Sequence, residues 1–498
     1  MNTRALGSLA AIVLFTAITR VAGGMPADLP QTFVTELRAF LALPNDADDP
    51  EAMLRNATWL AEAFGKRGFS TRDLSSGDYA LLYAERSSPG ADRTILFYLH
   101  FDGQPVDASQ WQQPDPYQAV LKARRDDVWE TIPWSSLEQR LDPEWRVFAR
   151  SASDDKGPII MLLHALDRLE QRNKPVQNNI KVILDGKEEK GSPRLAERIA
   201  EHKKLLAADY LIVIDGPQHP SNRPTITYGC RGITTASIVT YGPGKAAHSG
   251  HFGNVAPNPA FRLARLLASM KDDRGRVLIE GFYDGAGITE AERTLIEGLA
   301  DETEIIKRLL QVAALEQVGE GYHEALQYPS LNVRRLDSPL FGGVRTIVPD
   351  SAKAEFDIRL VPETSGVRQI ALLKRHLEQQ GFQVIEDTPS DAQRLRYDNI
   401  ATLKSRPGVP AFQTPADSPI GSFLRSALED ESSVPVEVPI MGGTVPITPF
   451  IRALDTPAVI VPLVNGDNNQ HSPNENLRLG NAVEGIRILA AILGHGGE

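Results

Sequence analysis

The chain has 498 residues, of which 42% are hydrophobic and 23% are charged. This is an ordinary globular composition on a chain longer than one hydrophobic core usually organises, so two domains are expected. The net charge is -11 and no long run of like charges occurs, which excludes a nucleic-acid tail and a polybasic membrane patch; no nucleic-acid partner is expected.

The first residues have the pattern of a secretory signal peptide. Arg4 precedes an apolar run over residues 6–18, and small residues follow at 21–24. We therefore predict that residues 1–22 are a signal peptide, that the protein is secreted or periplasmic, and that no stable membrane insertion remains after its removal. The apolar run is short for a membrane span, so an uncleaved anchor is the weaker alternative.

The single cysteine limits the kinds of site the chain can form. Cys230 is alone, so an intrachain disulfide and a Cys-rich metal site are excluded. Any metal must be held by His and carboxylate side chains. Cys230 lies in a glycine-rich, strand-like stretch, which favours a buried packing thiol over a nucleophile.

Strands and helices alternate in the first half of the chain. Short apolar runs predict strands at 94–99, 180–184 and 210–214, and apolar residues at helical spacing predict a helix over 157–172. The same alternation of strand and helix patterns occurs near the C-terminus, where a strand is predicted at 458–464 and a helix at 481–493. Together these elements predict an α/β domain with a mostly parallel central sheet flanked by helices, formed by residues 25–221 and 406–498.

The pattern changes between these two blocks. Alternating strands are predicted at 234–240 and 353–361, with helices at 260–270 and 367–380. Two strand and helix repeats of this kind indicate a separate α+β domain over residues 222–405, inserted into the first. Residues 271–326 are mostly charged and their pattern favours helices. We interpret this stretch as an elaboration of that insert.

Acidic and histidine residues follow the predicted parallel strands. His100 and Asp102 come directly after the first strand, where a carboxylate can orient a metal-bound imidazole, although a His and a turn-forming Asp at a strand end are also common. Asp154 and Asp155 stand before the helix that begins near 157. A carboxylate there can bridge two metals, and it is as often a helix cap or a partner of the helix dipole.

Two adjacent glutamates, Glu188 and Glu189, follow the strand at 180–184. A solvated turn tolerates such a pair, but a buried strand end requires a cation nearby. Asp215 follows the strand at 210–214, and His471 follows the strand at 458–464 across a polar loop. Open α/β sheets place their sites at these strand ends, and this set of N and O ligands suits two ions of Zn, Mn or Co that share one carboxylate.

Eight sequence blocks closely resemble the M20 family of metallopeptidases, particularly its carnosinase-like and nonspecific dipeptidase branch. They follow the family's order along nearly the whole mature chain. The blocks are HFDGQPV from His100, SDDKGP from Ser153, EEKGS from Glu188, TYGCRG from Thr227, HSG from His248, FDIRLVP from Phe356, GGTVP from Gly442 and HSPNE from His471.

The resemblance implies a role for each residue of the site. One ion would be held by His100, Asp154 and Asp215, and the other by His471, Asp154 and Glu189. Glu188 would be the catalytic base, and Asp102 would orient His100. Zinc is the expected metal, with Mn and Co as alternatives.

The resemblance also implies the role of the inserted domain, which would be a ferredoxin-like lid that carries a homodimer contact. Its His248 would stabilise the oxyanion, and His251 is the alternative imidazole for that role. Arg359 would hold a carboxylate of the substrate. Further substrate contacts would come from Asn332, Gly443 and Thr444.

The function implied is metal-dependent hydrolysis of a dipeptide or short peptide with a free C-terminal carboxylate, by an enzyme of dipeptidase or carboxypeptidase type. Deacylation of N-acyl amino acids on the same scaffold is one alternative. A catalytically inactive peptide-binding protein is the other, and the presence of every expected ligand and of Glu188 argues against it.

Overall fold

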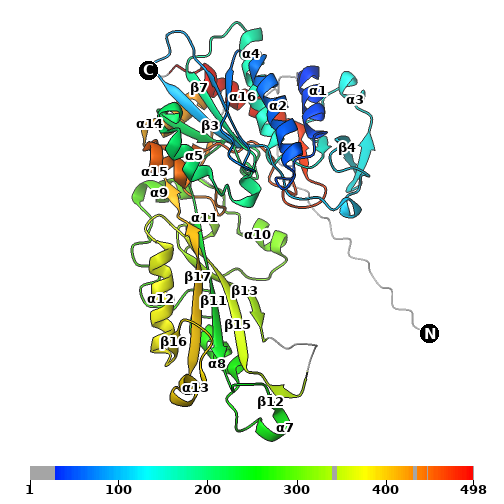
Figure 1. The fold of residues 1–498 in the computed structure, drawn as a ribbon. Helices are drawn as coiled ribbons and strands as arrows, with labels where there is room; N and C mark the ends of the chain where they lie inside the picture. Colours follow the sequence, from blue (N-terminus) through cyan, green and yellow to red (C-terminus); the bar gives the residue numbers. More distant parts are fainter. Residues whose placement is uncertain (1–28, 339–344, 430–433, 446, 497–498) are drawn as a thin grey trace, which may run out of the picture.

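A computed structural model describes residues 29–338, 345–429, 434–445 and 447–496. The predicted signal peptide, residues 1–22, lies outside the described residues. Figure 1 shows a broad upper body that contains both ends of the described chain and a narrower lower body formed by its middle. The upper body combines a large sheet with helices, which confirms the predicted α/β fold class.

An eight-stranded sheet forms the centre of the upper body. β3 pairs in parallel with both β7 and β8, and β8 pairs in parallel with β20. In spatial order its strands are β1 (Ser70–Asp73), β2 (Leu81–Arg86), β7 (Asn179–Asp185), β3 (Thr94–His100), β8 (Tyr210–Val213), β20 (Ala458–Ile460), β9 (Thr225–Thr227) and β19 (Val436–Val438).

Both faces of this sheet are covered by helices because consecutive residues of its central strands are apolar and point to opposite faces. In β3, Phe97 and Leu99 join the core on one face, whereas Leu96 and Tyr98 join the core on the other. The first face carries α1 (Gln31–Leu41), α2 (Pro50–Gly65), α4 (Lys156–Gln171), α14 (Pro419–Glu429) and α16 (Leu479–Gly494). The second carries α5 (Leu195–Glu201), α6 (Lys203–Leu206) and α15 (Thr448–Leu454).

A smaller antiparallel sheet joins distant parts of the chain beside the central sheet. Its strand order is β21 (Asn476–Arg478), β6 (Arg146–Phe148), β4 (Val120–Arg125) and β5 (Val128–Ile132). Because β21 pairs with β6, the loop after β20 is held against the segment that precedes α4. Two short helices belong to the same part of the chain: η1 (Ala108–Gln110) lies between β3 and β4, and α3 (Ser136–Gln139) lies between β5 and β6.

The lower body is built on a five-stranded sheet. Its strand order is β13 (Ser330–Asp337), β15 (Ser351–Leu360), β11 (Gly232–Tyr241), β17 (Ile400–Val409) and β16 (Gln383–Ile385). Residues of β11 alternate between buried and half-buried, and the buried ones pack beneath α8 (Pro259–Ala268) and α12 (Gly366–Gln379).

Short elements complete the lower body and its junction with the upper body. At the far end lie β12 (Ala247–His248), α7 (Ser249–Phe252), β14 (Ile347–Val348) and α13 (Asp391–Arg396). At the junction lie β10 (Gly229–Cys230), β18 (Phe412–Gln413), α9 (Glu290–Glu297), α10 (Thr303–Leu310) and α11 (Tyr322–Ala325). The last three helices form the charged stretch that was interpreted as an elaboration.

Most predicted elements are found within two residues of their expected limits. The strand expected at 458–464 is the exception, because β20 ends at Ile460 and the chain then reaches an isolated bridge between Val464 and Pro217. Cys230 is buried, as expected. The division into domains at residues 222 and 405 stays a prediction.

Candidate metal and catalytic site

The predicted ligands meet at one edge of the central sheet. His100 is the last residue of β3, and Asp215 follows β8. Glu188 and Glu189 open η2 (Glu188–Lys190), the helical turn after β7. The remaining two come from loops: Asp154 precedes α4, and His471 lies in the loop after β20. Parallel strands bring their carboxyl ends to one edge, which explains this convergence.

The first ligand group consists of His100, Asp154 and Asp215. One ligand atom from each lies within 4.8 Å of the others. His100 Nε2 lies 2.8 Å from Asp154 Oδ1, and the His100 side chain is 1% exposed. The set combines one imidazole with two carboxylates, which is suitable for a divalent transition-metal ion.

The second group consists of Asp154, Glu189 and His471, again within 4.8 Å. His471 Nε2 lies 3.1 Å from Asp154 Oδ2 and 3.2 Å from Glu189 Oε2. Asp154 thus presents Oδ1 to His100 and Oδ2 to His471. A carboxylate with one oxygen in each group is placed to bridge two ions.

The strand-end cluster, defined as His100, Asp154, Glu188, Glu189, Asp215 and His471, concentrates negative charge in a buried place. Burial, reinforced by Asp154, raises the pKa of Asp215 to about 6 and that of Glu189 to about 7. Burial opposes ionisation of Asp154 too, but hydrogen bonds with His100 and His471 hold its pKa below the usual range. Hydrogen bonding to Asp154 raises the pKa of His471 to about 9.

No Lys or Arg among the described residues forms an ion pair with these four carboxylates; their ion-pair partners are the two imidazoles. The two lysines beside the glutamates form ion pairs with other residues. Lys187 pairs with Asp78, and Lys190 pairs with Asp48. Buried carboxylates without such partners require another source of positive charge. The donor set and its electrostatics therefore fit the pair of divalent ions that the sequence predicts.

Glu188 differs from its neighbour Glu189. Its carboxylate forms no ion pair and no side-chain hydrogen bond with the described residues, whereas Glu189 contacts both His471 and Gln104. Burial, together with the charges of Asp215 and Glu189, raises the pKa of Glu188 well above its ordinary value. A carboxyl group with raised proton affinity and no internal partner can exchange a proton with a bound molecule.

Asp102 supports both parts of the cluster. Its carboxylate lies 3.3 Å from His100 Nδ1, as expected for a residue that orients His100. It also accepts hydrogen bonds of 3.0 Å from the backbone N–H groups of Glu188 and of Glu189. One fully buried carboxylate therefore positions a ligand and the turn that carries the paired glutamates.

Two supporting residues were missed by sequence reasoning. Glu475 is fully buried and accepts hydrogen bonds of 2.9 Å from the backbone N–H groups of Ser151, Ser153 and Asp154. Gln104 donates a 2.7 Å hydrogen bond to Glu189. Both lie in blocks that carry the resemblance, HFDGQPV and HSPNE, and that was the only available signal, since their partners are distant in sequence.

The predicted substrate contacts lie together at the junction of the two bodies. Arg359, in β15, donates a 3.1 Å hydrogen bond to Thr444 Oγ1, and its Nε lies 3.8 Å from Asp357. Asn332, in β13, donates a 2.8 Å hydrogen bond to Asp357. Gly443 adjoins Thr444, and there the Cβ of another residue would lie only 2.8 Å from Met441 Cε.

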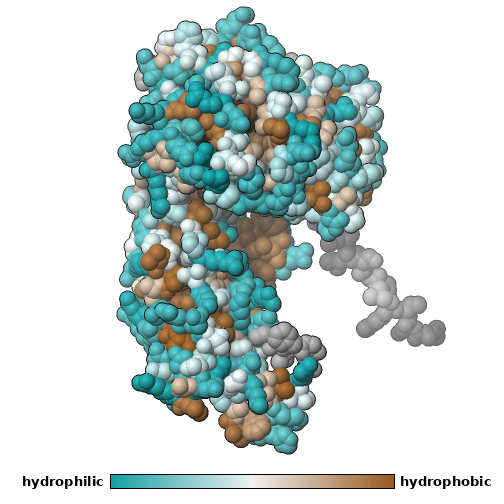
Figure 2. Space-filling model, in the orientation of Figure 1, coloured by the Kyte–Doolittle hydropathy of each residue, from teal (hydrophilic) through white to brown (hydrophobic). Residues whose placement is uncertain are grey.

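Cys230, in β10, is buried, and burial raises the pKa of its thiol to about 12. Figure 2 shows that the molecular surface is hollowed beneath the upper body, where the two bodies meet.

His248 is not brought to the strand-end cluster. It ends β12, which lies with α7 at the far end of the lower body (Figure 1). Its Nδ1 accepts a hydrogen bond from the backbone of Gly250, and its ring lies 4.9 Å from that of His251. Within this chain, neither histidine contacts the expected ligands.

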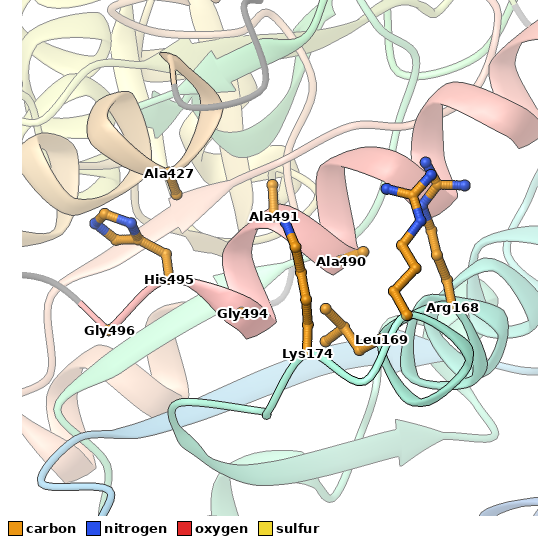
Figure 3. A pocket seen from close by; sticks show the side chains of 10 residues that line it. Arg168, Leu169, Lys174, Ala427, Ala490, Ala491, Gly494, His495 and Gly496 are labelled. Carbon is orange, nitrogen blue, oxygen red and sulfur yellow. The ribbon is translucent and has the colours of Figure 1, made fainter. Parts of the chain in front are cut away.

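A separate hollow of about 270 Å³ lies on the upper body between α4, α14 and α16 (Figure 3). Its lining includes Arg168, Arg172 and Lys174, together with small residues of α16. No residue of the strand-end cluster contributes to it, so it has no part in the chemistry described above.

Comparisons with known proteins agree with this geometry. The model of Peptidase family M20/M25/M40 matches residues 96–495. Mouse Beta-Ala-His dipeptidase is 27% identical over 485 residues, covering 92% of each chain, and Saccharomyces cerevisiae Cys-Gly metallodipeptidase is 25% identical over 488 residues, covering 93% of this chain and 95% of the relative. The structure of an M20 family metallo-carboxypeptidase from Sulfolobus solfataricus has a TM-score of 0.73 at 27% identity, covering 94% of this chain and 99% of that one.

The predicted secreted or periplasmic location is contradicted. The yeast Cys-Gly metallodipeptidases that this chain resembles are cytosolic dipeptidases, so the likeness does not support export. A charged start and an apolar run were insufficient grounds for that prediction. In the described part of the chain, no helix has both the length and the apolar character needed to cross a bilayer.

The resemblance that began with eight short blocks thus extends over most of the chain and over the fold. Peptidases of this family bind two metal ions, and the ligand groups at the sheet edge are consistent with that property. The chain belongs to peptidase family M20 and is a peptidase of its dipeptidase-containing branch.

Proposed function

We propose that the protein is a metal-dependent exopeptidase that hydrolyses the amide bond of dipeptides or short peptides with a free C-terminal carboxylate. The observation that carries this proposal is the pair of ligand groups joined by Asp154, with the unpaired carboxylate of Glu188 beside them. The dipeptidase names of the most similar curated relatives support the class of substrate.

The first group, His100, Asp154 and Asp215, would hold one divalent ion, and Asp154, Glu189 and His471 would hold the other. Their nitrogen and oxygen donors suit zinc, with Mn and Co as alternatives. Two such ions, when bound, supply Lewis acidity and lower the pKa of a shared water. Glu475 and Asp102 keep these ligands in place through the backbone hydrogen bonds described above.

Glu188 would act as the general base. It would take the proton from the attacking water and later give it to the leaving amine. Burial raises the pKa of Glu188, and a higher proton affinity makes its carboxylate a stronger base towards the water. Asp102 fixes the backbone of Glu188 and so the direction of its side chain.

Arg359 would bind the C-terminal carboxylate of the substrate. A guanidinium group can donate two parallel hydrogen bonds to a carboxylate, which a point charge cannot do. Asn332, Gly443 and Thr444 would complete this end of the site. Thr444 is already held to both Arg359 and the backbone of Arg231.

The lower body would act as a ferredoxin-like lid, over residues 222–405, and as the contact of a homodimer. The place of His248 favours this arrangement, since an exposed imidazole at the far end of the lower body can serve an oxyanion only in the site of a second copy. His251 remains the alternative for that role.

The test is a hydrolysis assay on the metal-loaded protein, with dipeptides of the Ala-Ala type compared with N-acetyl amino acids under Zn, Mn and Co. We expect dipeptide hydrolysis that stops on chelation and returns with metal. Preference for N-acetyl amino acids would replace the proposal by a deacylase. Metal-loaded protein that binds peptides without hydrolysing either substrate would indicate the binding-only alternative.

A further inference from the structure

A second gathering of histidine and carboxylate side chains lies outside the strand-end cluster. It consists of His219, Glu302 and His323, named here the outer cluster, with one ligand atom from each within 4.8 Å of the others. His219 Nε2 lies 3.2 Å from Glu302 Oε1, and His323 Nε2 lies 3.5 Å from Glu302 Oε2.

Three separate segments supply the outer cluster. His219 lies in the same loop as Asp215, after β8. Glu302 is the residue that precedes α10, and His323 lies in α11, so both come from the charged stretch between the two bodies. No local sequence pattern joins them, and tertiary packing alone brings two imidazoles to one carboxylate.

The polar atoms of the outer cluster are buried and poorly satisfied. The side chains of His219, Glu302 and His323 are 10%, 8% and 11% exposed. In the described structure, His219 Nε2 and both ring nitrogens of His323 are buried and form no hydrogen bond. Buried polar atoms without partners destabilise a protein, so these nitrogens require something to bind.

An ion pair between Glu302 and a protonated histidine is the simplest alternative, and the environment opposes it. Burial, with the neighbouring charge of His219, lowers the pKa of His323 to about 4, and burial lowers the pKa of His219 as well. Both imidazoles are therefore neutral at pH 7, the form that binds metals.

His219 is held in place by Ser221. The backbone N–H of Ser221 donates a 3.2 Å hydrogen bond to His219 Nδ1, and Ser221 Oγ lies 2.9 Å from the same nitrogen. Contacts of this kind at one ring nitrogen orient an imidazole whose other nitrogen, Nε2, lies 3.2 Å from Glu302.

The distances fit a metal ion as well. A tetrahedral zinc ion with bonds of about 2.0–2.1 Å to nitrogen and oxygen separates its ligand atoms by roughly 3.3 Å. The observed separations of 3.2 and 3.5 Å lie on either side of that value. We propose that His219, Glu302 and His323 bind one further divalent metal ion, preferably zinc, distinct from the two ions of the strand-end cluster.

The expected role of this ion is structural. It would fasten the residues around α10 and α11 to the loop that carries Asp215. Another hydrogen bond, from Arg231 to the carbonyl of Tyr328, ties the residues after α11 to the segment between β10 and β11. No residue of the outer cluster is assigned to the reaction.

The experiment is elemental analysis of the full chain after loading with Zn²⁺ and removal of free metal. We expect three zinc ions per chain in the wild type and two in His323→Ala, with dipeptide hydrolysis retained. Glu302→Gln keeps the shape of the carboxylate without its charge and should also bind two. His202→Ala, at the end of α5, is the matched control and should bind three. Far-UV circular dichroism checks that each variant is folded.

The two proposals fail in different ways. A wild type with two ions, and the same two in His323→Ala and Glu302→Gln, would overturn the outer site and leave the proposed function intact. One ion in the wild type that is lost in His323→Ala would support the outer site while contradicting the di-metal peptidase. If His323→Ala does not fold, the comparison rests on Glu302→Gln.

Discussion

Two clusters of charged side chains in the upper body shift the pKa values of their carboxyl groups in opposite directions. The helix cluster joins α1, α4 and the turn after α2, and it consists of Glu36, Arg67, His164 and Asp167. Arg67 bonds to Asp167 at 2.7 and 2.8 Å and to Glu36 at 2.8 Å. The hydrogen bond from His164, assisted by Arg67, lowers the pKa of Glu36 to about 2. In the strand-end cluster, the pKa values of Glu188, Glu189 and Asp215 rise instead.

The difference lies in the source of the positive charge. The helix cluster contains its own guanidinium group, so its carboxylates are satisfied by the fold and stabilise it. The strand-end cluster has only two imidazoles for four carboxylates, so the proposed metal ions would have to supply the remaining positive charge. A buried carboxylate that pairs with an Arg of the protein therefore contributes to the fold. A buried carboxylate that has no cationic partner indicates a binding site.

The largest effect is expected at Glu188, whose carboxylate pairs with neither an Arg nor a His among the described residues. Glu188→Gln removes the base and keeps the ligands, so turnover should fall by roughly 10²- to 10⁴-fold while metal content stays unchanged. Steady-state hydrolysis and elemental analysis measure the two quantities. Glu197→Gln, an exposed residue of α5, should alter neither. Metal loss in Glu188→Gln equal to that in Glu189→Ala or His471→Ala would show that Glu188 is a ligand.

In the helix cluster, removal of the internal cation should change stability and leave the chemistry unchanged. Arg67→Met leaves Glu36 and Asp167 with His164 as their remaining ion-pair partner and should lower the free energy of unfolding by about 3 kcal/mol, as measured by urea denaturation. Metal content and turnover at 25 °C should be retained. Arg55→Met, on the exposed face of α2, is the control. A loss of bound metal in Arg67→Met would erase the distinction between the two clusters.

A weaker effect is expected where the fold supports the ligands. Asp102→Asn turns an amide group towards the backbone N–H of Glu188 or Glu189, so one hydrogen bond becomes a repulsive contact. Metal affinity should fall roughly 10- to 100-fold, as measured by competition with a chromophoric chelator. Asp167→Asn in the helix cluster should leave the affinity unchanged. Equal affinities in the two variants would show that Asp102 does not position the ligands.

The smallest effect concerns acid stability. The pKa of Glu36 is lowered on folding, so its charged form stabilises the protein above pH 4.5, and this contribution is lost as the pH falls to about 2. Allowing for solvent screening at a partly exposed carboxylate, we expect a loss of about 1–2 kcal/mol across that window. Urea denaturation at several pH values should show a flatter profile for Glu36→Gln, and identical profiles would contradict the pairing.

That the side chains of the strand-end cluster come together was predictable from sequence because each follows an apolar strand or precedes a helix, and parallel strands end at a common edge. The central strands and α4 were predictable because their apolar residues recur with the period of the element. The pairing of β21 with β6 was not, since it joins residues 146–148 to residues 476–478 and no local pattern records such a partnership. For the same reason the sequence did not reveal that Glu475 holds the backbone beside Asp154.

By itself, the sequence determined the α/β class, the family and the residue types that can hold metal, because these follow from local periodicity and short ordered blocks. Only the tertiary structure decided which carboxylates have an internal cation, how Asp154 divides its two oxygens, that Asp102 holds the paired glutamates, and that His219, Glu302 and His323 meet. Those properties depend on distances between segments far apart in the chain. Such distances are set when the helices and sheets pack.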